Sequence, residues 1–142
     1  MDLGLSGDLQ FPHTGGSTNF NISGAVGRYV SHSSLVGVGV GVFAGWGPQP
    51  IQEFQLSGRY RYLFHTRNPK IFPFLEAGPG VDVTHGGGTS TMYMVRGEAG
   101  VKCFIARNVS LEPAYNFVYI GSHQTVPSAS VSALTIGLAF TL

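Results

Sequence analysis

Side chains able to carry out nucleophilic or metal chemistry are few and scattered in this chain. His123 is followed by Thr125, so an imidazole and a hydroxyl lie close enough in sequence to act as base and nucleophile. A β-branched hydroxyl is a weak substitute for serine, and both residues also fit an ordinary loop. All five histidines are expected in loops or turns: His13, His32, His65, His85 and His123. The sequence therefore predicts no catalytic residue, with His123 and Thr125 as a weak alternative.

A metal or cofactor site finds little support in the residue spacing. His13, His85 and His123 are expected on one side of the molecule, but their spacing matches no known ligand pattern. Cys103 is the single cysteine, which excludes an internal disulfide and a multi-cysteine metal site. The glycine-rich runs are not followed by Gly-Lys-Ser/Thr, so they do not match a phosphate-binding loop. No metal and no cofactor are predicted.

Charged side chains fall on one face of several alternating segments. In the segment 52–64, for example, Glu53, Arg59 and Arg61 alternate with aromatic residues. We predict that seven charged residues from the central segments meet in the interior as a network: Arg59, Glu76, Asp82, Arg96, Glu98, Lys102 and Glu112.

The elements that position these charges are β-strands. Residues 35–46 carry Val, Ala or Trp at every even position, whereas most odd positions are glycine, so the segment has one apolar and one nearly bare face. The same period of two predicts eight strands, at 2–11, 19–30, 35–46, 52–64, 71–84, 92–105, 110–120 and 131–142. Pro73 and Pro79 weaken the fifth, because each removes a ladder donor. Arg28 falls on an apolar face, where it either snorkels to an interface or is re-aimed by a bulge.

Composition limits the class of protein. A chain of 142 residues is expected to form a single domain, 1–142. Charged residues make up 11%, against about 25% in soluble domains. The net charge of +1 provides no basic patch, so nucleic acid is not an expected partner. No apolar run is long enough for a transmembrane helix. Residues 1–11 lack the basic and apolar regions of a signal peptide, so any such peptide is expected to have been removed.

The apolar faces could point inward or outward. A soluble lipocalin-like ligand-binding barrel would turn them inward. Three features favour the outward direction: all seven acidic residues are on the polar faces, these faces are rich in Gly, Ala and Ser, and several aromatic residues lie toward strand ends, as interfacial girdles do. The girdle residues are Trp46, Tyr60, Tyr62, Phe64, Tyr115 and Tyr119. The sequence therefore predicts an all-β fold, an eight-stranded antiparallel up-and-down transmembrane β-barrel.

Three stretches resemble small outer-membrane β-barrel proteins of the OmpA/OmpX type. They are Phe-Pro-Phe-Leu-Glu-Ala-Gly-Pro-Gly-Val at 72–81, Gly-Glu-Ala-Gly-Val at 97–101 and Gly-Leu-Ala-Phe-Thr-Leu at 137–142. The last is similar to the C-terminal signal that the outer-membrane assembly machinery reads, although it ends in Leu142 instead of an aromatic residue. The resemblance implies the bacterial outer membrane, periplasmic termini, and turns at 31–34, 65–70 and 106–109 on the periplasmic side. Loops 12–18, 47–51, 85–91 and 121–130 would then face outward.

The resemblance also sets the expected function and partners. It favours a non-catalytic membrane scaffold or assembly component with a side-chain-filled lumen and no open pore. Some lipid A deacylases are barrels of this size, but their His-x-Ser-Asn motif is here His123-Gln-Thr125-Val. A deacylase-like hydrolase is thus the alternative. The expected partners are the lipid bilayer, lipopolysaccharide and the assembly machinery, with self-association or another membrane protein as a further expectation.

Hairpin geometry predicts which charges pair. Centring the turn at 65–70 sets Arg59 opposite Glu76. Centring the next hairpin near 88–91 sets Glu76 beside Lys102 and Asp82 beside Arg96. The following turn sets Lys102 beside Glu112. The expected result is a belt of alternating charges around the wall.

Overall fold

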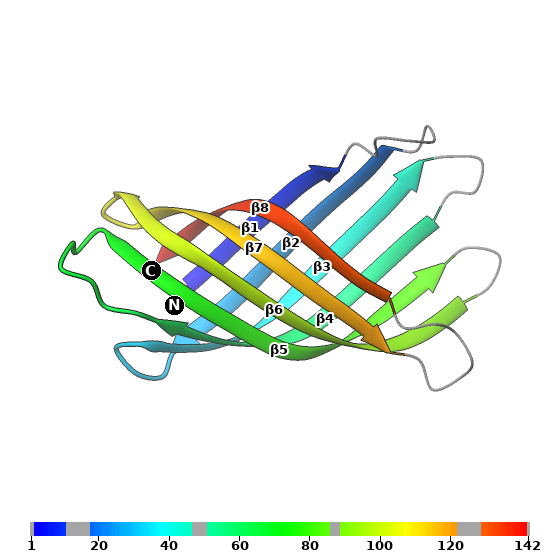
Figure 1. The fold of residues 1–142 in the computed structure, drawn as a ribbon, viewed down its shortest axis with the longest axis horizontal. Helices are drawn as coiled ribbons and strands as arrows, with labels where there is room; N and C mark the ends of the chain where they lie inside the picture. Colours follow the sequence, from blue (N-terminus) through cyan, green and yellow to red (C-terminus); the bar gives the residue numbers. More distant parts are fainter. Residues whose placement is uncertain (1, 11–17, 47–50, 86–88, 122–128, 142) are drawn as a thin grey trace.

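The chain folds as a closed barrel of eight antiparallel strands, each hydrogen-bonded to the next, with the first strand paired to the last (Figure 1). The structure, a computed structural model, describes residues 2–10, 18–46, 51–85, 89–121 and 129–141. The strands are β1 Asp2–Gln10, β2 Thr18–Tyr29, β3 Ser34–Trp46, β4 Ile51–Leu63, β5 Ile71–His85, β6 Thr89–Ala106, β7 Val109–Gly121 and β8 Ala129–Thr141. The predicted fold class is confirmed.

The observed strands coincide with the predicted ones except at their ends. The largest difference is at β6, which begins at Thr89 and not at residue 92, because Thr89, Ser90 and Thr91 pair with the end of β5. The predicted loop at 85–91 is therefore too long, since only residues 86–88 separate the two strands. Threonine favours strands, and the two threonines extend the ladder here.

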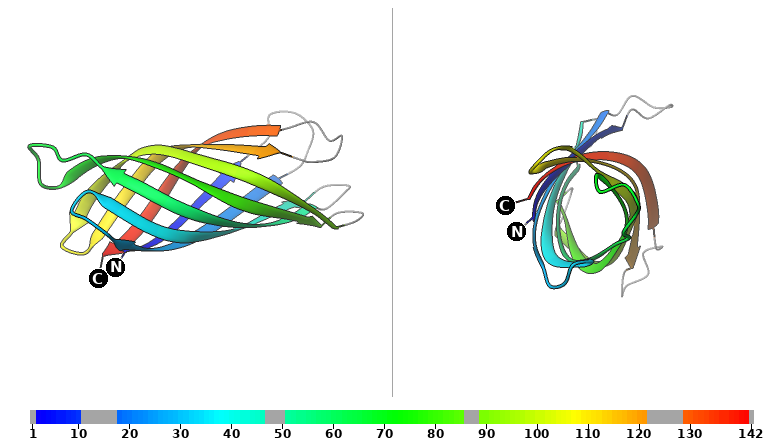
Figure 2. Two further views of the ribbon diagram at one scale, coloured as in Figure 1. Left: turned by 90° about the horizontal axis from the view of Figure 1, so that it is seen from below. Right: turned by 90° about the vertical axis from the view of Figure 1, so that its left-hand side faces the viewer.

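The apolar faces point outward. On β3, which lies between β2 and β4, the outward residues Val36, Val38, Val40 and Val42 are exposed. Leu35 of the same strand is buried. Leu134, Ile136, Leu138 and Phe140 continue the outward apolar surface on β8. A lipocalin-like barrel would have the opposite arrangement. Figure 2, in its right-hand panel, looks along the barrel and shows the strands tilted around its axis, which is how a closed sheet forms.

Most of the expected girdle residues are exposed on this outer surface. They are Tyr60, Tyr62, Phe64, Tyr115 and Tyr119. Tyr62 and Phe64 make an edge-to-face contact with ring centroids 5.0 Å apart. The side chain of Trp46 lies outside the part of the chain that the structure describes. Arg28 is exposed beside Val36, and the β2–β3 register runs without a shift, so the side chain lies on the outward face and no bulge re-aims it.

Pro73 and Pro79 are accommodated within β5, a strand of 15 residues. The β4–β5 ladder has no pairs for Gly58 and Arg59, next to Pro79, which has no N–H to donate. At Gly78 the two strands come so close that an added Cβ would collide with the carbonyl oxygen of Gly58. Glycine at 78 is therefore required for the approach of β5 to β4.

Both termini and three turns lie at one end of the barrel, on the left in Figure 1. The turns comprise residues 30–33, 64–70 and 107–108. The strand ends next to residues 11–17, 47–50, 86–88 and 122–128 lie at the opposite end, and these residues themselves are not among those described. Among the described residues, no helix is long and apolar enough to cross a membrane.

Candidate functional site

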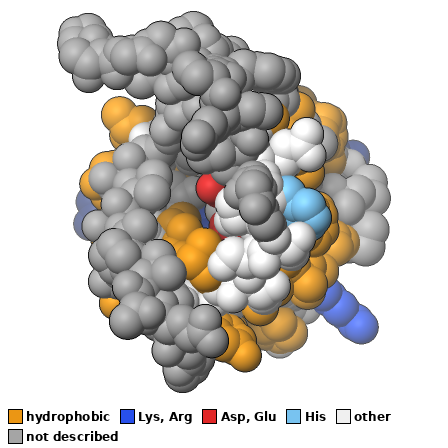
Figure 3. Space-filling view, turned by 90° about the vertical axis from the view of Figure 1, so that its right-hand side faces the viewer, with side chains coloured by type: hydrophobic (Ala, Val, Ile, Leu, Met, Phe, Trp, Pro, Cys, Tyr) orange, Lys and Arg blue, Asp and Glu red, His pale blue; other side chains and the backbone are white. Residues whose placement is uncertain are grey.

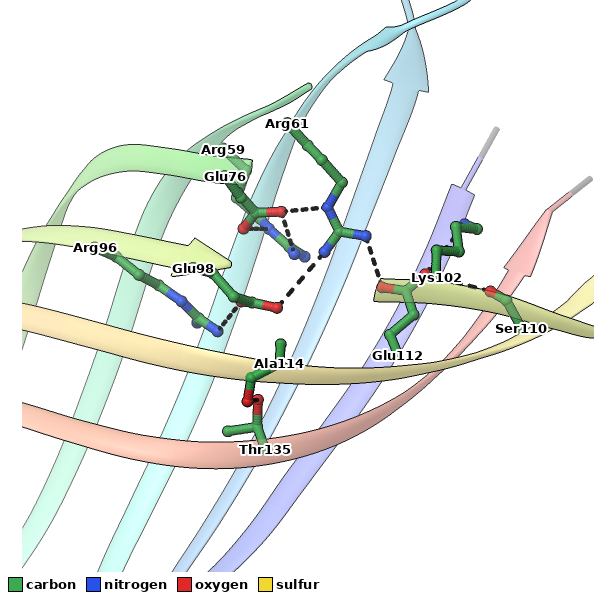
Figure 4. A network of polar contacts seen from close by, with 10 residues as sticks. All are labelled: Arg59, Arg61, Glu76, Arg96, Glu98, Lys102, Ser110, Glu112, Ala114 and Thr135. Atoms are coloured by element: carbon green, nitrogen blue, oxygen red, sulfur yellow. Dashed lines mark hydrogen bonds and ion pairs between the residues drawn. The ribbon is translucent and has the colours of Figure 1, made fainter. Parts of the chain in front are cut away.

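Inward positions of β4, β5, β6 and β7 bring seven charged side chains together inside the barrel (Figure 4). Because side chains alternate along a strand, charges two residues apart point to the same side. We call these residues the luminal charge cluster: Arg59, Arg61, Glu76, Arg96, Glu98, Lys102 and Glu112. Their side chains are 1–15% exposed, so the pairs are shielded from bulk water.

Arg61 lies at the centre of the cluster. Its Nε donates to Glu76 Oε2 at 2.7 Å, and its Nη1 donates to Glu112 Oε2 at 2.6 Å. Its Nη2 lies 3.8 Å from Glu98 Oε1. The guanidinium also lies over the ring of Phe74, 3.9 Å from the centroid, in cation–π geometry. One arginine thus links carboxylates from three strands.

The other three cations each extend the cluster from one glutamate. Arg59 donates to both carboxylate oxygens of Glu76, through Nε to Oε1 and through Nη2 to Oε2 at 2.7 Å. Arg96 Nη2 donates to Glu98 Oε2 at 3.0 Å. Lys102 Nζ lies 3.2 Å from Glu112 Oε1, which also accepts from Ser110 Oγ. Four cations therefore share three carboxylates.

Glu76 and Glu98 are direct cross-strand partners on β5 and β6. Like charges in this position repel each other. Arg61, directly opposite Glu76 on β4, compensates for the repulsion by approaching both carboxylates. The negative charges of the cluster are therefore compensated only when its arginines are charged and in place.

The predicted pairing is partly correct. Arg59 and Glu76 are in contact, and Lys102 and Glu112 are in contact across the β6–β7 hairpin. The register of the first hairpin is nevertheless shifted by two residues from the prediction, so Arg61, not Arg59, is opposite Glu76. The reason is that the connection begins at Phe64 and is folded by Thr66, whose hydroxyl donates to the carbonyls of Asn68 and Ile71.

Two predicted pairs across the β5–β6 hairpin are wrong. Lys102 is opposite Phe72 instead of Glu76, and Asp82 is opposite Met92 instead of Arg96. The ladder ends with His85 paired to Thr89, so residues 86–88 connect the two strands. Each residue of β5 is therefore opposite a β6 residue four positions earlier in the chain than predicted. Centring the turn on the three glycines at 86–88 would have given the observed pairing.

Asp82 lies apart from the cluster and is completely buried. Its carboxylate accepts from Gln55 Nε2 at 2.9 Å and from Thr84 Oγ1 at 3.0 Å. No ion pair of Asp82 occurs among the described residues. Neutral amide and hydroxyl donors hold this carboxylate, in place of the predicted arginine.

The wall opposite the cluster is built from small residues of β2, β3 and β8, including Ser23, Ala25 and Gly39. A cavity of about 40 Å³ separates this wall from Arg59, Arg61 and Glu98. This is room for a few water molecules. Figure 3 looks into the other end of the barrel and shows acidic atoms inside the hollow, with apolar side chains around the outside.

Among the described residues, two buried polar atoms have no hydrogen-bond partner: Arg96 Nε, whose side chain lines this cavity, and Asn116 Oδ1. Asn116 is opposite Glu98, two positions from Arg96 along the ladder. A donor and an acceptor of this kind are suited to water. The cavity beside the cluster therefore has both polar and apolar residues in its lining.

Arg61 is the central residue of the cluster, and it is absent from the predicted network. Its position on the same face as Arg59 was evident, but the assumed register placed Arg59 opposite Glu76 and gave Arg61 no partner. Phe74 was also missed, because an aromatic residue on a polar face gives no signal of a cation–π contact.

The remaining candidates do not form a second site among the described residues. His32 is exposed, while His65 and His85 contact hydroxyls of Ser33 and Thr89. His13, His123 and Thr125 lie outside the described residues. Within the described ranges, no three His, Cys, Asp or Glu side chains are grouped so as to hold a metal ion. The grouping that the structure does provide is the buried, ion-paired luminal charge cluster.

Comparison with known proteins places the fold among outer-membrane β-barrels. No protein-family model matches the chain, and no curated protein matches it in sequence. Neisserial surface protein A is similar in structure, with a TM-score of 0.77 and 18% identity over 99% of this chain and 95% of that protein. The N-terminal barrel domain of Pseudomonas aeruginosa OprF has a TM-score of 0.67 and 14% identity, over 98% and 96%. The outer membrane enzyme PagL has a TM-score of 0.61 and 15% identity, over the full length of both chains.

Proposed function

We propose that the protein is a non-catalytic, integral outer-membrane barrel that serves as a scaffold or structural component and has no open pore. The observation that carries the proposal is the distribution of side chains: apolar residues cover the outside and ion pairs are buried inside. Exposed apolar surface of this extent is unfavourable in water and suits a hydrocarbon environment. The strands, of 9 to 18 residues, are long enough to cross a bilayer at a tilt.

One feature supports a closed lumen, and a second supports a structural role. Eight-stranded barrels have interiors only wide enough for side chains, and here Arg61 and its three glutamates occupy part of that space. The connections at the end opposite the termini are short, since the longest intervals between strands there are seven residues. Short connections offer little surface for a dedicated receptor or adhesin.

Several features of the environment are part of the proposal. Short turns and the termini are typically periplasmic in such barrels, so we infer that the ends of the chain lie in the periplasm and that the opposite connections approach lipopolysaccharide. The assembly machinery would read the C-terminal strand. We infer that the protein would act structurally by self-association through the exposed valines of β3, or by contact with another membrane protein.

The alternative is a deacylase-like hydrolase, which the resemblance to lipid A deacylases of this size raises, with His123 and Thr125 as its weak candidate residues. The similar fold of the enzyme PagL keeps it open. A lipid A deacylation assay on the purified protein in detergent separates the two functions. The scaffold predicts no released acyl chain above a heat-denatured sample. Turnover that is abolished in His123→Ala would replace the scaffold with the enzyme.

Membrane insertion and closure are tested together in planar bilayers. We expect the purified chain to need detergent or lipid to stay dispersed, to insert into bilayers and to show no steady conductance step. A native fold that stays monodisperse without detergent would exclude the membrane proposal. A steady open channel would exclude the plug while leaving the membrane location intact.

A further inference from the structure

Basic residues outside the lumen are confined to one end of the barrel. The chain has eight Lys and Arg residues, of which Arg59, Arg61, Arg96 and Lys102 belong to the luminal charge cluster. The other four are all exposed and lie at the end that carries the termini: Arg28, Arg67, Lys70 and Arg107. The sequences of the opposite connections, 11–17, 47–50, 86–88 and 122–128, contain no Lys or Arg. The positive charge is thus one-sided.

Two of these residues border a pocket. It lies between the 64–70 turn and the end of β6, and its lining combines two cations with apolar side chains: Pro69, Lys70, Phe72, Phe104, Ile105, Ala106 and Arg107. Phe72 and Phe104 meet edge to face with centroids 5.9 Å apart. The pocket therefore has an apolar floor and a cationic rim.

The backbone builds this pocket by two specific features. A register shift between Phe104 and Ala106 leaves Ile105 as an extra residue in β6, and its side chain is exposed. The 64–70 turn is held against the same strand, because Phe104 N donates to the carbonyl of Lys70 at 2.9 Å. The side chain of Asn68 accepts from Lys70 N at 3.0 Å. Lys70 is therefore on an ordered turn beside the bulge that precedes Arg107.

The pocket lies where the outer apolar surface ends. Phe64 and Ile71 are exposed apolar residues at the ends of β4 and β5, and Ile105 is the last on β6. Lys70 and Arg107 lie immediately beyond them in the chain. In a barrel that crosses a bilayer, this level corresponds to the lipid headgroups.

The two cations have no ion pair among the described residues. Of the acidic residues toward this end, Asp2 is on β1, which is adjacent to β2 and β8 and not to β5, β6 or β7. Glu112 of β7 is paired with Arg61 and Lys102 in the luminal charge cluster. An exposed lysine and arginine beside the outward-facing Ile105 match an amphiphilic anion, with the phosphate on the cations and the glycerol and upper acyl chain on the isoleucine. Phe72 and Phe104 close the inner side of the pocket, where they lie beside Leu63 and Lys102.

We propose that the pocket between the 64–70 turn and the end of β6 binds the phosphate of an anionic phospholipid, held by Lys70 and Arg107. This rests on the proposed membrane location, but not on which side of the membrane the termini face. The site would fix one lipid of the leaflet at the terminus end, and would thereby anchor the β4–β5 and β6–β7 turns to the membrane surface.

Native mass spectrometry of the full chain in a non-ionic detergent, titrated with phosphatidylglycerol or phosphatidylcholine, tests the site. The test variant is Lys70→Gln/Arg107→Gln. The matched control is Arg28→Gln/Arg67→Gln, which removes the same charge from the same end but leaves the pocket intact. A basic residue near an anionic lipid surface contributes about 1 kcal/mol, or about fivefold in affinity. We expect phosphatidylglycerol to bind about 30-fold more weakly to the test variant and less than threefold more weakly to the control.

Three results would overturn the proposal. One is unchanged phosphatidylglycerol binding in the test variant, and another is an equal loss in the control, which would mean a diffuse effect of net charge. The third is full displacement of the lipid by millimolar inorganic phosphate, which would mean a site for a soluble anion. If the double variant does not fold, as judged by its heat-dependent gel mobility, Arg107→Gln alone should still show the fivefold loss.

The outcomes also separate this site from the proposed function. A wild-type chain that fails to insert into vesicles refutes the membrane location. A wild-type chain that inserts but binds phosphatidylglycerol and phosphatidylcholine equally refutes only the lipid site.

Discussion

Removing the charge of Glu76 should destabilise the barrel more than any single substitution at its turns. Glu76 accepts three hydrogen bonds from Arg59 and Arg61 and is almost completely buried. In Glu76→Gln the cluster would keep four cations but only two carboxylates, Glu98 and Glu112. Breaking a buried ion pair by removing one partner costs about 3 to 5 kcal/mol, because the remaining charge is uncompensated.

The matched control is Glu53→Gln. Glu53 is also on the inward face, of β4, but it is only half buried and has no ion pair among the described residues. Its substitution should change the free energy of unfolding by less than about 1 kcal/mol. The assay is urea unfolding in lipid vesicles, followed by the gel mobility of the folded barrel and extrapolated linearly to zero urea.

A second substitution tests the cause of the loss. Arg59 is bonded to Glu76 alone within the cluster, so Glu76→Gln/Arg59→Met removes both members of the pair. Replacing both partners of a buried pair is often close to neutral, and we expect the double variant to recover most of the lost stability. The reasoning fails if Glu76→Gln is as stable as Glu53→Gln, or if the double variant is no more stable than Glu76→Gln.

Three other predictions concern single sites. Arg61→Met should lower the free energy of unfolding less than Glu76→Gln does, although Arg61 has the most contacts, because it leaves three cations with three carboxylates. The same urea assay would contradict this if Arg61→Met were the less stable variant. Gly78→Ala should lower the free energy of unfolding by about 1 to 3 kcal/mol or prevent folding, because the added methyl group would collide with the carbonyl of Gly58. A free energy of unfolding equal to that of the wild type would show that the strands can separate there at no cost. His123→Ala and Thr125→Ala should leave the unfolding curve and lipid A unchanged, and a lost deacylase activity in either would support the hydrolase.

The sequence contained enough information for the barrel because the alternation is strict. In β3 every second residue is glycine over much of the strand, and this pattern is compatible only with a sheet that has two different faces. The direction of the faces was also predictable, since the acidic residues share the face that is rich in small residues. The strand ends were predicted less well. Residues 89–91 are all polar, so they show no alternation with apolar residues and resemble a loop in the sequence.

The charge cluster was predictable only in outline. Alternation identifies which charges face the lumen, but their pairing depends on the register, and the register depends on where each turn closes. At β6–β7 the short turn left one choice, and the contact between Lys102 and Glu112 followed. At β5–β6 the predicted register matches charges, whereas the ladder ends with His85 paired to Thr89. The bulge at Ile105, and with it the pocket beside Arg107, has no signal in the alternation.

The most direct test of the central claim is the environment of one outward side chain in the middle of a strand. In a Cys103→Ser background, Val40→Cys can carry a nitroxide label, since Val40 is exposed at the centre of β3. In vesicles, collision of the label with dissolved oxygen should exceed its collision with a water-soluble nickel complex, as expected for a lipid-facing site. Ser110→Cys, which is completely buried, should remain unlabelled in the folded barrel. Preferential collision of the Val40→Cys label with the nickel complex would contradict the account, because it would place the apolar face in water.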